Sequence, residues 1–214
     1  MNYKESFPFF NQLSDEGKRL IEIGSVIKEY DSDVTLNNLS NSCIGIMYIL
    51  EGEVRCYINT LEGKEITLFR LLPTDFCLFS ASCILKLDYE VFIDVKKGTK
   101  AKIIPPNIIK KLNDTEIAFV KHTNTIVNER LSDVMFLIDN ILSKRLDERI
   151  IDFLIDEYDI KHTLELTITH DEIANHLGSS REVITRMLKH LQDDGLITLK
   201  RGKIIINDID KLTY

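Results

Sequence analysis

The stretch DFCLFSASCIL, residues 75–85, holds two of the four cysteines of the chain, Cys77 and Cys83, in an otherwise apolar run. Cysteine thiols can ligate a metal or haem iron, form a disulfide, or serve as small buried hydrophobic groups. Residues six apart on a continuous helix point about 120° apart, so a disulfide there would be strained, whereas a bent loop would allow one. Three interpretations of this pair therefore stay open: core packing, thiol redox sensing, and metal or haem ligation.

A second group of chemically active side chains is basic and lies near the C-terminus. Between Ser179 and Lys203 six basic residues oppose three acidic ones, which makes this segment positive in a chain of net charge −7. The six are Arg181, Arg186, Lys189, Lys200, Arg201 and Lys203. A basic face on an acidic body is typical of a protein that binds a nucleic-acid duplex.

Helix signals surround these basic residues. Thr169 and Glu172 form a capping box, which predicts a helix that ends at Gly178. Ser179 and Glu182 form a second box, which predicts another helix with an inward apolar face. That face comprises Val183, Ile184, Met187, Leu188 and Leu191. Two helices joined by a short glycine-containing turn make a helix-turn-helix.

The second of these helices carries the side chains suited to reading bases. Arg181, Glu182 and Arg186 project opposite its apolar face. Arginine can donate two hydrogen bonds to guanine and glutamate can accept one from cytosine, each contact discriminating by about 1–3 kcal/mol. We therefore predict that these three residues read bases. Hydroxyl and basic groups nearby are expected to contact phosphates: Ser179, Ser180, Thr185, Lys189, Lys200, Arg201 and Lys203.

A further element follows Gly195. The runs LITL and KIII flank Lys200-Arg201-Gly202, which predicts a two-stranded wing with a basic tip. A winged helix can also be used for protein contacts alone, and that alternative stays open.

The N-terminal half predicts β-structure. From about Val34 to Ile104, short runs rich in β-branched and aromatic residues alternate with turn signals at Gly52, Gly63, Pro73 and Gly98. In the loop NTLEGKE, Gly63 supplies the unusual backbone angle that a hairpin needs. Many short strands at regular spacing predict a β-sandwich or barrel.

Past Pro105-Pro106 the period changes to that of a long helix. Apolar residues recur alternately three and four apart, which is the heptad seam of a two-stranded coiled coil. The seam comprises Ile117, Val120, Asn124, Val127, Leu131, Val134, Ile138 and Ile141. We expect this helix to pair with that of a second copy. Asn124, the one polar member, either pairs across a parallel dimer to fix the register or touches water.

A further helix, with Ser143 as its N-cap, leads into the C-terminal domain. The predicted fold is α+β, with a β-domain at 1–112, a dimerisation helix at 113–142 and a winged helix-turn-helix at 143–214. No apolar run reaches about 18 residues, and the N-terminus lacks a signal-peptide pattern. We therefore expect a cytoplasmic protein with reduced thiols and no membrane partner.

These features resemble the CRP/FNR family of bacterial transcription regulators across nearly the whole chain, from FPFFNQLSDEGKRLIE through YILEGEVRCY to the wing. The resemblance is most specific in the reading head EIANHLGSSREVITRMLKHLQDDGLI. The resemblance implies a β-roll (jelly roll) of the cyclic-nucleotide-binding type and a homodimer that binds double-stranded DNA and acts with RNA polymerase. Its recognition helices would enter successive major grooves of an inverted repeat, about 34–36 Å apart. Arg181, Glu182 and Arg186 match positions at which family members read TGTGA-type half-sites, so a related palindrome is expected.

The signal that the β-roll senses is not expected to be cAMP or cGMP. Members that bind cyclic nucleotides use a Gly-Glu segment for the ribose and an Arg-Ser pair for the phosphate, which should fall near residues 73–92. This chain has no arginine between Arg70 and Arg130 and no glycine between Gly63 and Gly98. A phosphate buried without a cation or backbone donors is unfavourable.

The cofactor stays unknown. Iron–sulfur members use a cluster of N-terminal cysteines, and no cysteine precedes Cys43. Haem needs an axial ligand, for which His122, Cys77 and Cys83 are the candidates. Haem and iron–sulfur therefore remain alternatives, whereas Cys43 and Cys56 are expected to be structural.

Two other classes of function fit less well. A cupin-type enzyme needs several metal ligands in its barrel, yet no histidine occurs in the first 121 residues and no nucleophile–base motif is present, so the protein is not expected to be an enzyme. A cyclic-nucleotide-regulated subunit that does not bind DNA would keep the phosphate cassette and would not need a basic reading helix. The remaining histidines are expected to be surface or capping groups: His162, His170, His176 and His190.

Overall fold

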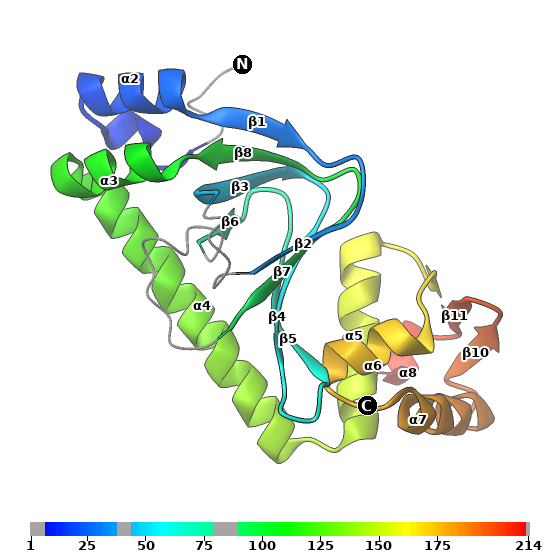
Figure 1. Ribbon diagram of the computed structural model, residues 1–214. Helices are drawn as coiled ribbons and strands as arrows, with labels where there is room; N and C mark the ends of the chain where they lie inside the picture. The colour runs from blue at the N-terminus through cyan, green and yellow to red at the C-terminus, as the bar shows by residue number, and fades with distance from the viewer. Residues whose placement is uncertain (1–6, 38–43, 79–89, 213–214) are drawn as a thin grey trace. The chain divides into compact units, whose positions relative to one another are not determined.

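The computed structural model describes residues 7–37, 44–78 and 90–212 (Figure 1). The chain divides into two compact units, which are described separately. The first comprises the residues up to Ile58 together with Leu68–Met135, and the second comprises Asn59–Thr67 together with the chain from Phe136.

The strands of the N-terminal half form two four-stranded sheets, in the orders β1-β8-β3-β6 and β2-β7-β4-β5. The strands are β1 (Val26–Glu29), β2 (Val34–Asn37), β3 (Ile46–Glu51), β4 (Val54–Asn59), β5 (Glu65–Leu71), β6 (Phe76–Cys77), β7 (Phe92–Val95) and β8 (Lys100–Ile104). Pairing is antiparallel between β8 and both β1 and β3, and between β7 and both β2 and β4. The predicted β-sandwich is confirmed.

Alternating side chains of these strands fill the sandwich. On β4, Val54 and Cys56 are fully buried, and they share one apolar cluster with Phe69 of β5, Ile93 of β7 and Cys77 of β6. A strand places every second side chain on the same face, so an alternating sequence buries one face in this core. The turn after β4 is closed by hydrogen bonds between Thr60 and both Gly63 and Lys64, and Gly63 has a φ of +77°, as expected for this hairpin.

Several elements of this half were not predicted, among them the short strand β6, the helices η1 (Phe10–Gln12) and α2 (Asp15–Gly24), strand β1 and helix α3 (Pro106–Thr115). Strand β1 is exposed at all four residues and pairs only at the edge of its sheet, so it lacks the alternating pattern that reveals a half-buried strand. Helix α3 begins with proline at its first turn, where the missing N–H costs nothing, and buries Ile108, Ile109 and Leu112.

Helices cover one end of the β-roll. A short helix η1 (Phe10–Gln12) and α2 (Asp15–Gly24) precede β1, and their cluster of Phe7, Phe9 and Phe10 packs with Phe119 of the long helix α4 (Ile117–Ser143). Ser14 caps α2 by accepting a hydrogen bond from the Gly17 N–H, and its own N–H and hydroxyl donate to the buried Glu116 carboxylate. The start of α2 is thereby joined to the start of α4.

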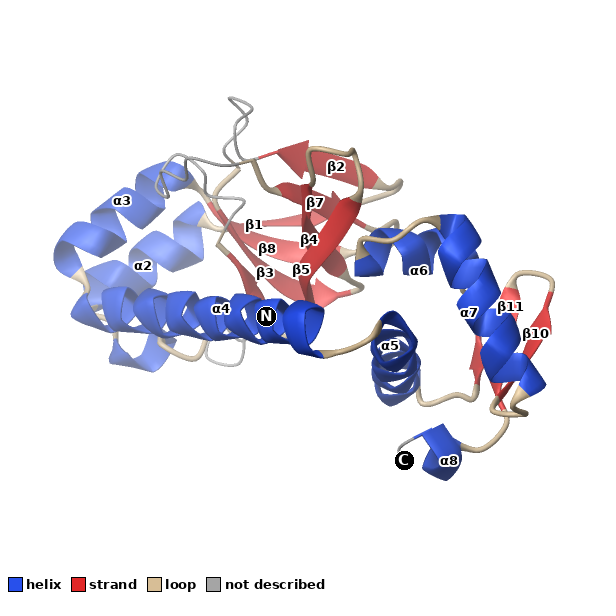
Figure 2. Cartoon of the chain, turned by 90° about the horizontal axis from the view of Figure 1, so that it is seen from below, coloured by secondary structure: helices blue, strands red, loops and turns tan. Residues whose placement is uncertain are grey.

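The second unit is a winged helix (Figure 2). It comprises α5 (Leu146–Lys161), β9 (Glu165–Leu166), α6 (His170–Leu177), α7 (Arg181–Asp193), β10 (Ile197–Lys200), β11 (Lys203–Ile206) and α8 (Ile209–Leu212). Its apolar cluster draws on α5, α6, α7 and all three strands. The sequence had predicted Ser143 as the N-cap of α5, and this prediction is wrong, because Ser143 is the last residue of α4. Helix α5 begins after Arg145, whose N–H donates to Glu148.

Candidate nucleic-acid interface

Helix α6 begins and ends as its sequence predicts. The Thr169 hydroxyl accepts a hydrogen bond from the Glu172 N–H, and the Glu172 carboxylate accepts from the Thr169 N–H at 2.8 Å. Gly178 then adopts a left-handed conformation, with φ of +67°, and ends the helix. The predicted capping box and turn are both confirmed.

Helix α7 is capped by Ser180. The Ser180 hydroxyl accepts from the Val183 N–H at 3.4 Å, so the prediction of Ser179 as the capping residue is wrong by one position. Ile184, Leu188 and Leu191 are buried on its inner face, whereas Arg181, Glu182 and Arg186 are exposed. The three predicted base readers therefore lie together on the outer face of the helix.

The outer face of α7 forms an open groove of about 520 Å³, which we call the reading face. It is lined by Arg181, Glu182, Thr185, Arg186, Lys189, His190 and Asp193. A hydrogen bond from its own backbone N–H, and then one from the Ser180 hydroxyl, lower the pKa of Glu182, so its carboxylate is ionised and can accept hydrogen bonds. Among the described residues Arg186 and Lys189 form no ion pair, so both cations are available to a ligand.

The first turn of α6 contacts the reading face. Asp171 forms an ion pair with Arg181, with 3.1 Å between Oδ2 and Nη1, and His170 Nδ1 lies 2.8 Å from the hydroxyl of Thr185. Burial is the main cause that lowers the pKa of His170, and the nearby Arg181 cation lowers it further. Sequence reasoning had placed His170 among surface or capping groups and did not single out Asp171. The sequence did contain a signal for them, because the capping box of Thr169 and Glu172 places His170 and Asp171 in the first turn of α6.

The predicted wing is confirmed. Strands β10 and β11 pair antiparallel with Lys200 opposite Lys203, and the turn at Arg201-Gly202 is exposed. Lys203 contacts the carboxylate of Glu165 on β9, and this contact lowers the pKa of Glu165. Lys200 and Arg201 thus lie at the wing tip, whereas Lys203 is held against the third strand.

Exposed apolar side chains of α4 lie both on the predicted seam and beside it, where Met135, Phe136 and Leu142 are exposed as well. Ile117, Val127, Leu131, Ile138 and Ile141 are 38–73% exposed, Asn124 is also exposed, and Val120 and Val134 are half-buried. Phe119 and Ile126, which are buried in the apolar cluster of the β-roll, are each one residue from a seam position and hence about 100° around the helix from it. A water-exposed apolar stripe of this length is unfavourable for an isolated chain. Among the described residues no helix is long and apolar enough to cross a membrane.

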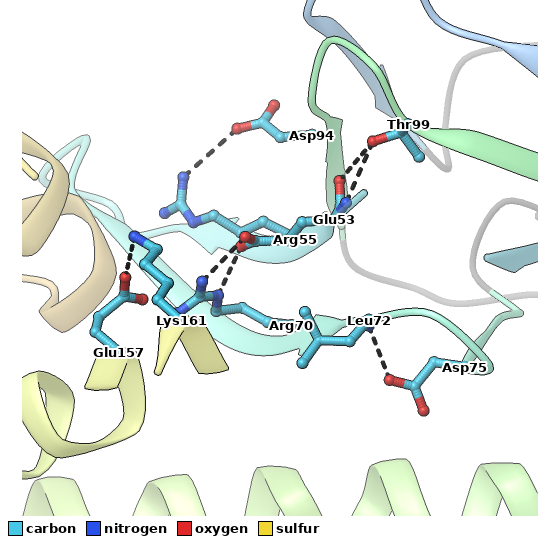
Figure 3. Close-up of polar contacts among 9 residues, drawn as sticks. All are labelled: Glu53, Arg55, Arg70, Leu72, Asp75, Asp94, Thr99, Glu157 and Lys161. Atoms are coloured by element: carbon cyan, nitrogen blue, oxygen red, sulfur yellow. Dashed lines mark hydrogen bonds and ion pairs between the residues drawn. The ribbon is translucent and has the colours of Figure 1, made fainter. Parts of the chain in front are cut away.

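In the β-roll, Arg55 and Arg70 are engaged with carboxylates (Figure 3). Residues 79–89 of the segment expected to hold a cyclic phosphate lie outside the described residues. Arg70 donates two hydrogen bonds to Glu53, at 2.6 and 3.0 Å, and Arg55 lies 3.5 Å from Asp94. Arg130 reaches in from α4, lies over the Phe69 ring and pairs with Asp133. These pairings place each cation beside an acidic partner of the chain itself.

Cys77 lies beside Cys56 in the core of the sandwich. The two side chains are 1% and 0% exposed and their thiols are within hydrogen-bonding contact. Burial raises the pKa of Cys56, and the Cys77 thiol raises it further. Cys83 and Cys43 lie outside the described residues. The structure thus brings together Cys56 and Cys77, a pair that the sequence did not suggest.

His122, the histidine expected nearest the β-roll, is held between aromatic rings. Its ring centroid lies 5.0 Å from that of Phe9 and 5.1 Å from that of Phe76, and its Nε2 is buried without a hydrogen-bond partner among the described residues. Desolvation lowers its pKa. Within residues 7–37, 44–78 and 90–212, no three histidine, cysteine or acidic side chains are arranged to hold a metal.

The chain is similar in sequence and fold to known proteins. Residues 148–214 match the family described as Crp-like helix-turn-helix domain. A crystal structure described as a putative transcriptional regulator of the crp/fnr family from Eubacterium rectale ATCC 33656 is 42% identical, covers 98% of this chain and 97% of its own, and superposes with a TM-score of 0.92. The cAMP-activated global transcriptional regulator CRP of Escherichia coli is 28% identical over 193 residues, 84% of this chain and 88% of that protein. Transcriptional regulator SdrP of Thermus thermophilus is 27% identical over 170 residues, 77% of this chain and 80% of that protein.

Proposed function

The chain belongs to the CRP/FNR family of transcription regulators, and from this membership we propose that it acts as a homodimer that binds a palindromic, TGTGA-like operator under the control of a signal sensed by its β-roll. In this proposal residues 1–112 sense the signal, 113–142 form the dimer, and 143–214 bind DNA. In the same proposal the protein is cytoplasmic, has RNA polymerase as a partner at the promoter, and is not an enzyme.

The reading face carries this proposal. Arg181, Glu182 and Arg186 are exposed together on one face of a helix whose opposite face is buried, which is the geometry that a major groove requires. An ionised carboxylate between two arginines supplies one acceptor and two bidentate donors, and so matches a mixed sequence of cytosine and guanine. Lys189, Lys200 and Arg201, which flank this face, are proposed to contact phosphates.

We propose that the signal is not a cyclic nucleotide. The segment expected to hold the phosphate, residues 73–92, lacks arginine and glycine, and Arg70 and Arg55 of the β-roll are paired with Glu53 and Asp94. An anion would have to displace these carboxylates at a cost in electrostatic energy. The signal changes how the two α4 helices pack and thereby repositions the DNA-binding domains.

The experiment selects binding sites for the purified protein from random duplexes and then compares variants by fluorescence anisotropy. Glu182→Ala should bind related sequences almost equally, because each lost base contact removes about 1–3 kcal/mol of discrimination. The matched control Lys189→Ala should weaken binding to all sequences alike and reduce the salt dependence by about one charge. Unchanged affinity and unchanged preference for Glu182→Ala would contradict the proposed role.

A further inference from the structure

We propose that Asp171, on the first turn of α6, is a positioning residue that holds Arg181 for base reading and restrains it from binding phosphates nonspecifically. This inference rests on the proposed function of the reading face. It assigns to α6 a part in sequence discrimination that α7 would otherwise carry alone.

The role of Asp171 is separate from the cap of its helix. Thr169 and Glu172 form the capping box by hydrogen bonds to each other, so the start of α6 does not need the Asp171 carboxylate. That carboxylate instead lies 3.1 Å from Arg181 on the neighbouring helix. Removing it should therefore leave α6 folded and change only the reading face.

The ion pair is strong enough to orient Arg181 and weak enough to release it. Both side chains are largely exposed, 64% for Arg181 and 57% for Asp171, and such pairs are weak in water. A long arginine side chain samples many rotamers when it has no partner, so even a weak pair restricts it toward the side of α6. Guanine offers two acceptors at O6 and N7 and can replace the single carboxylate contact.

The same pair disfavours binding to the wrong DNA. A lone arginine cation gains energy from any phosphate, whereas Arg181 must first give up Asp171. Discrimination improves when an interface penalises unwanted partners as well as favouring the correct one. Asp171 thus reduces the charge that Arg181 presents to DNA of arbitrary sequence.

A second contact shows the same arrangement one turn further along α7. The His170 ring is bonded to the Thr185 hydroxyl at 2.8 Å, and Thr185 also lines the reading face. Neighbouring residues of one turn of α6 therefore hold neighbouring side chains of the reading face. This bond orients the Thr185 side chain on the reading face, and the hydroxyl keeps further hydrogen-bonding capacity for a phosphate.

The test measures affinity for the selected operator and for a scrambled duplex of the same length, over a series of salt concentrations. Asp171→Ala should bind the scrambled duplex about two- to fivefold more tightly, the range expected for an exposed ion pair. For the scrambled duplex, the slope of the logarithm of the binding constant against the logarithm of the salt concentration should become more negative by about 0.9, the value for one additional phosphate contact. The ratio of operator to scrambled affinity should fall, and Asp171→Glu should restore it.

Two controls separate positioning from simple loss of negative charge. Asp193→Ala removes the same charge from the same groove, but Asp193 lies twelve residues from Arg181, about 18 Å along α7. It should raise both affinities alike and leave the ratio unchanged. In an Arg181→Ala background, Asp171→Ala should no longer change the ratio, because the residue that it positions is absent.

The proposal is overturned if Asp171→Ala and Asp193→Ala change the ratio equally, or if the effect of Asp171→Ala persists without Arg181. Either result leaves the proposed function intact, since the wild type still prefers its operator. A wild type that prefers no sequence at all would overturn both the proposed function and this inference.

Discussion

Cys77 is buried beside Cys56, and this environment disfavours thiol chemistry. Thiolate is the reactive form of cysteine, and burial in apolar surroundings raises the thiol pKa and blocks access. Burial does raise the pKa of Cys56, and Cys77 is 1% exposed. Of the three interpretations of Cys77, its structure favours core packing.

In a variant that carries Cys43→Ser and Cys83→Ser, the remaining thiols should be Cys56 and Cys77 alone. We expect an aromatic disulfide reagent to modify them at least about tenfold more slowly in the folded protein than in urea, because one unit of raised pKa alone removes nine-tenths of the thiolate. Absorbance of the released thiol measures the rate. Equal modification rates in the folded protein and in urea would contradict core packing and favour a redox role for Cys77.

His122 should make stability depend on pH. Its folded pKa lies below the ordinary value of 6.5, because desolvation disfavours the charged ring. As the pH falls through 6.5, the unfolded chain takes up a proton that the folded protein does not, so the free energy of unfolding should decrease. Urea denaturation between pH 7.5 and 5.5 measures this decrease.

His122→Phe should reduce that pH dependence. The aromatic ring keeps the packing against Phe9 and Phe76 and removes the titrating group. The slope should fall without vanishing, since the pKa of His170 is lowered as well. An unchanged slope in His122→Phe would show that other groups cause the pH dependence.

Helix α4 presents an apolar seam that the chain does not cover with its own described residues. Leu131, at the middle of the seam, is 59% exposed. Burying a leucine is worth about 1.5–3 kcal/mol, and the two copies in a dimer would contribute twice that amount. The dimer should therefore be sensitive to a single charge at this position.

Leu131→Glu should raise the dissociation constant of the dimer by at least about a hundredfold, since 1.4 kcal/mol corresponds to a factor of ten. Sedimentation equilibrium measures the constant. The adjacent exposed Ser132, about 100° around the helix, offers the control Ser132→Glu, which adds the same charge outside the seam. Equal effects of the two variants would argue against pairing through the seam.

Elements with a strong local pattern could be predicted from the sequence, and elements defined by tertiary contacts could not. The capping box of Thr169 and Glu172, the heptad spacing of α4 and the alternating strand β4 each carry their own signal. Strand β1 is exposed throughout and exists because β8 pairs with it, which no local pattern records. The contact of Cys56 with Cys77 likewise joins two sheets and depends on their packing.

The same limit applies to the reading face. Arg181, Glu182 and Arg186 could be identified because helix periodicity alone puts them opposite the apolar face. The pairs Asp171–Arg181 and His170–Thr185 depend on how α6 packs on α7, so their partners could not be assigned from spacing. The one-residue error at Ser179 is of the size usual for helix ends.

At the scale of the whole molecule, the proposed function requires two reading faces, one from each protomer, on one DNA. A homodimer with two-fold symmetry binds an inverted repeat, and its two recognition helices reach successive major grooves on one side of the duplex. On a single half-site only one of the two protomers could contact DNA, so at least half of the contacts between protein and DNA would be lost. Affinity should therefore depend steeply on the distance between half-sites.

The most direct measurement is the affinity of the purified protein for its selected inverted repeat, for a single half-site, and for a repeat lengthened at its centre by about five base pairs, which turns one half-site to the opposite side of the duplex. Binding of one dimer to the intact repeat, with affinity at least about a hundredfold higher than for the other two duplexes, is the predicted result. Equal affinity for all three would contradict a dimer that reads both half-sites at once.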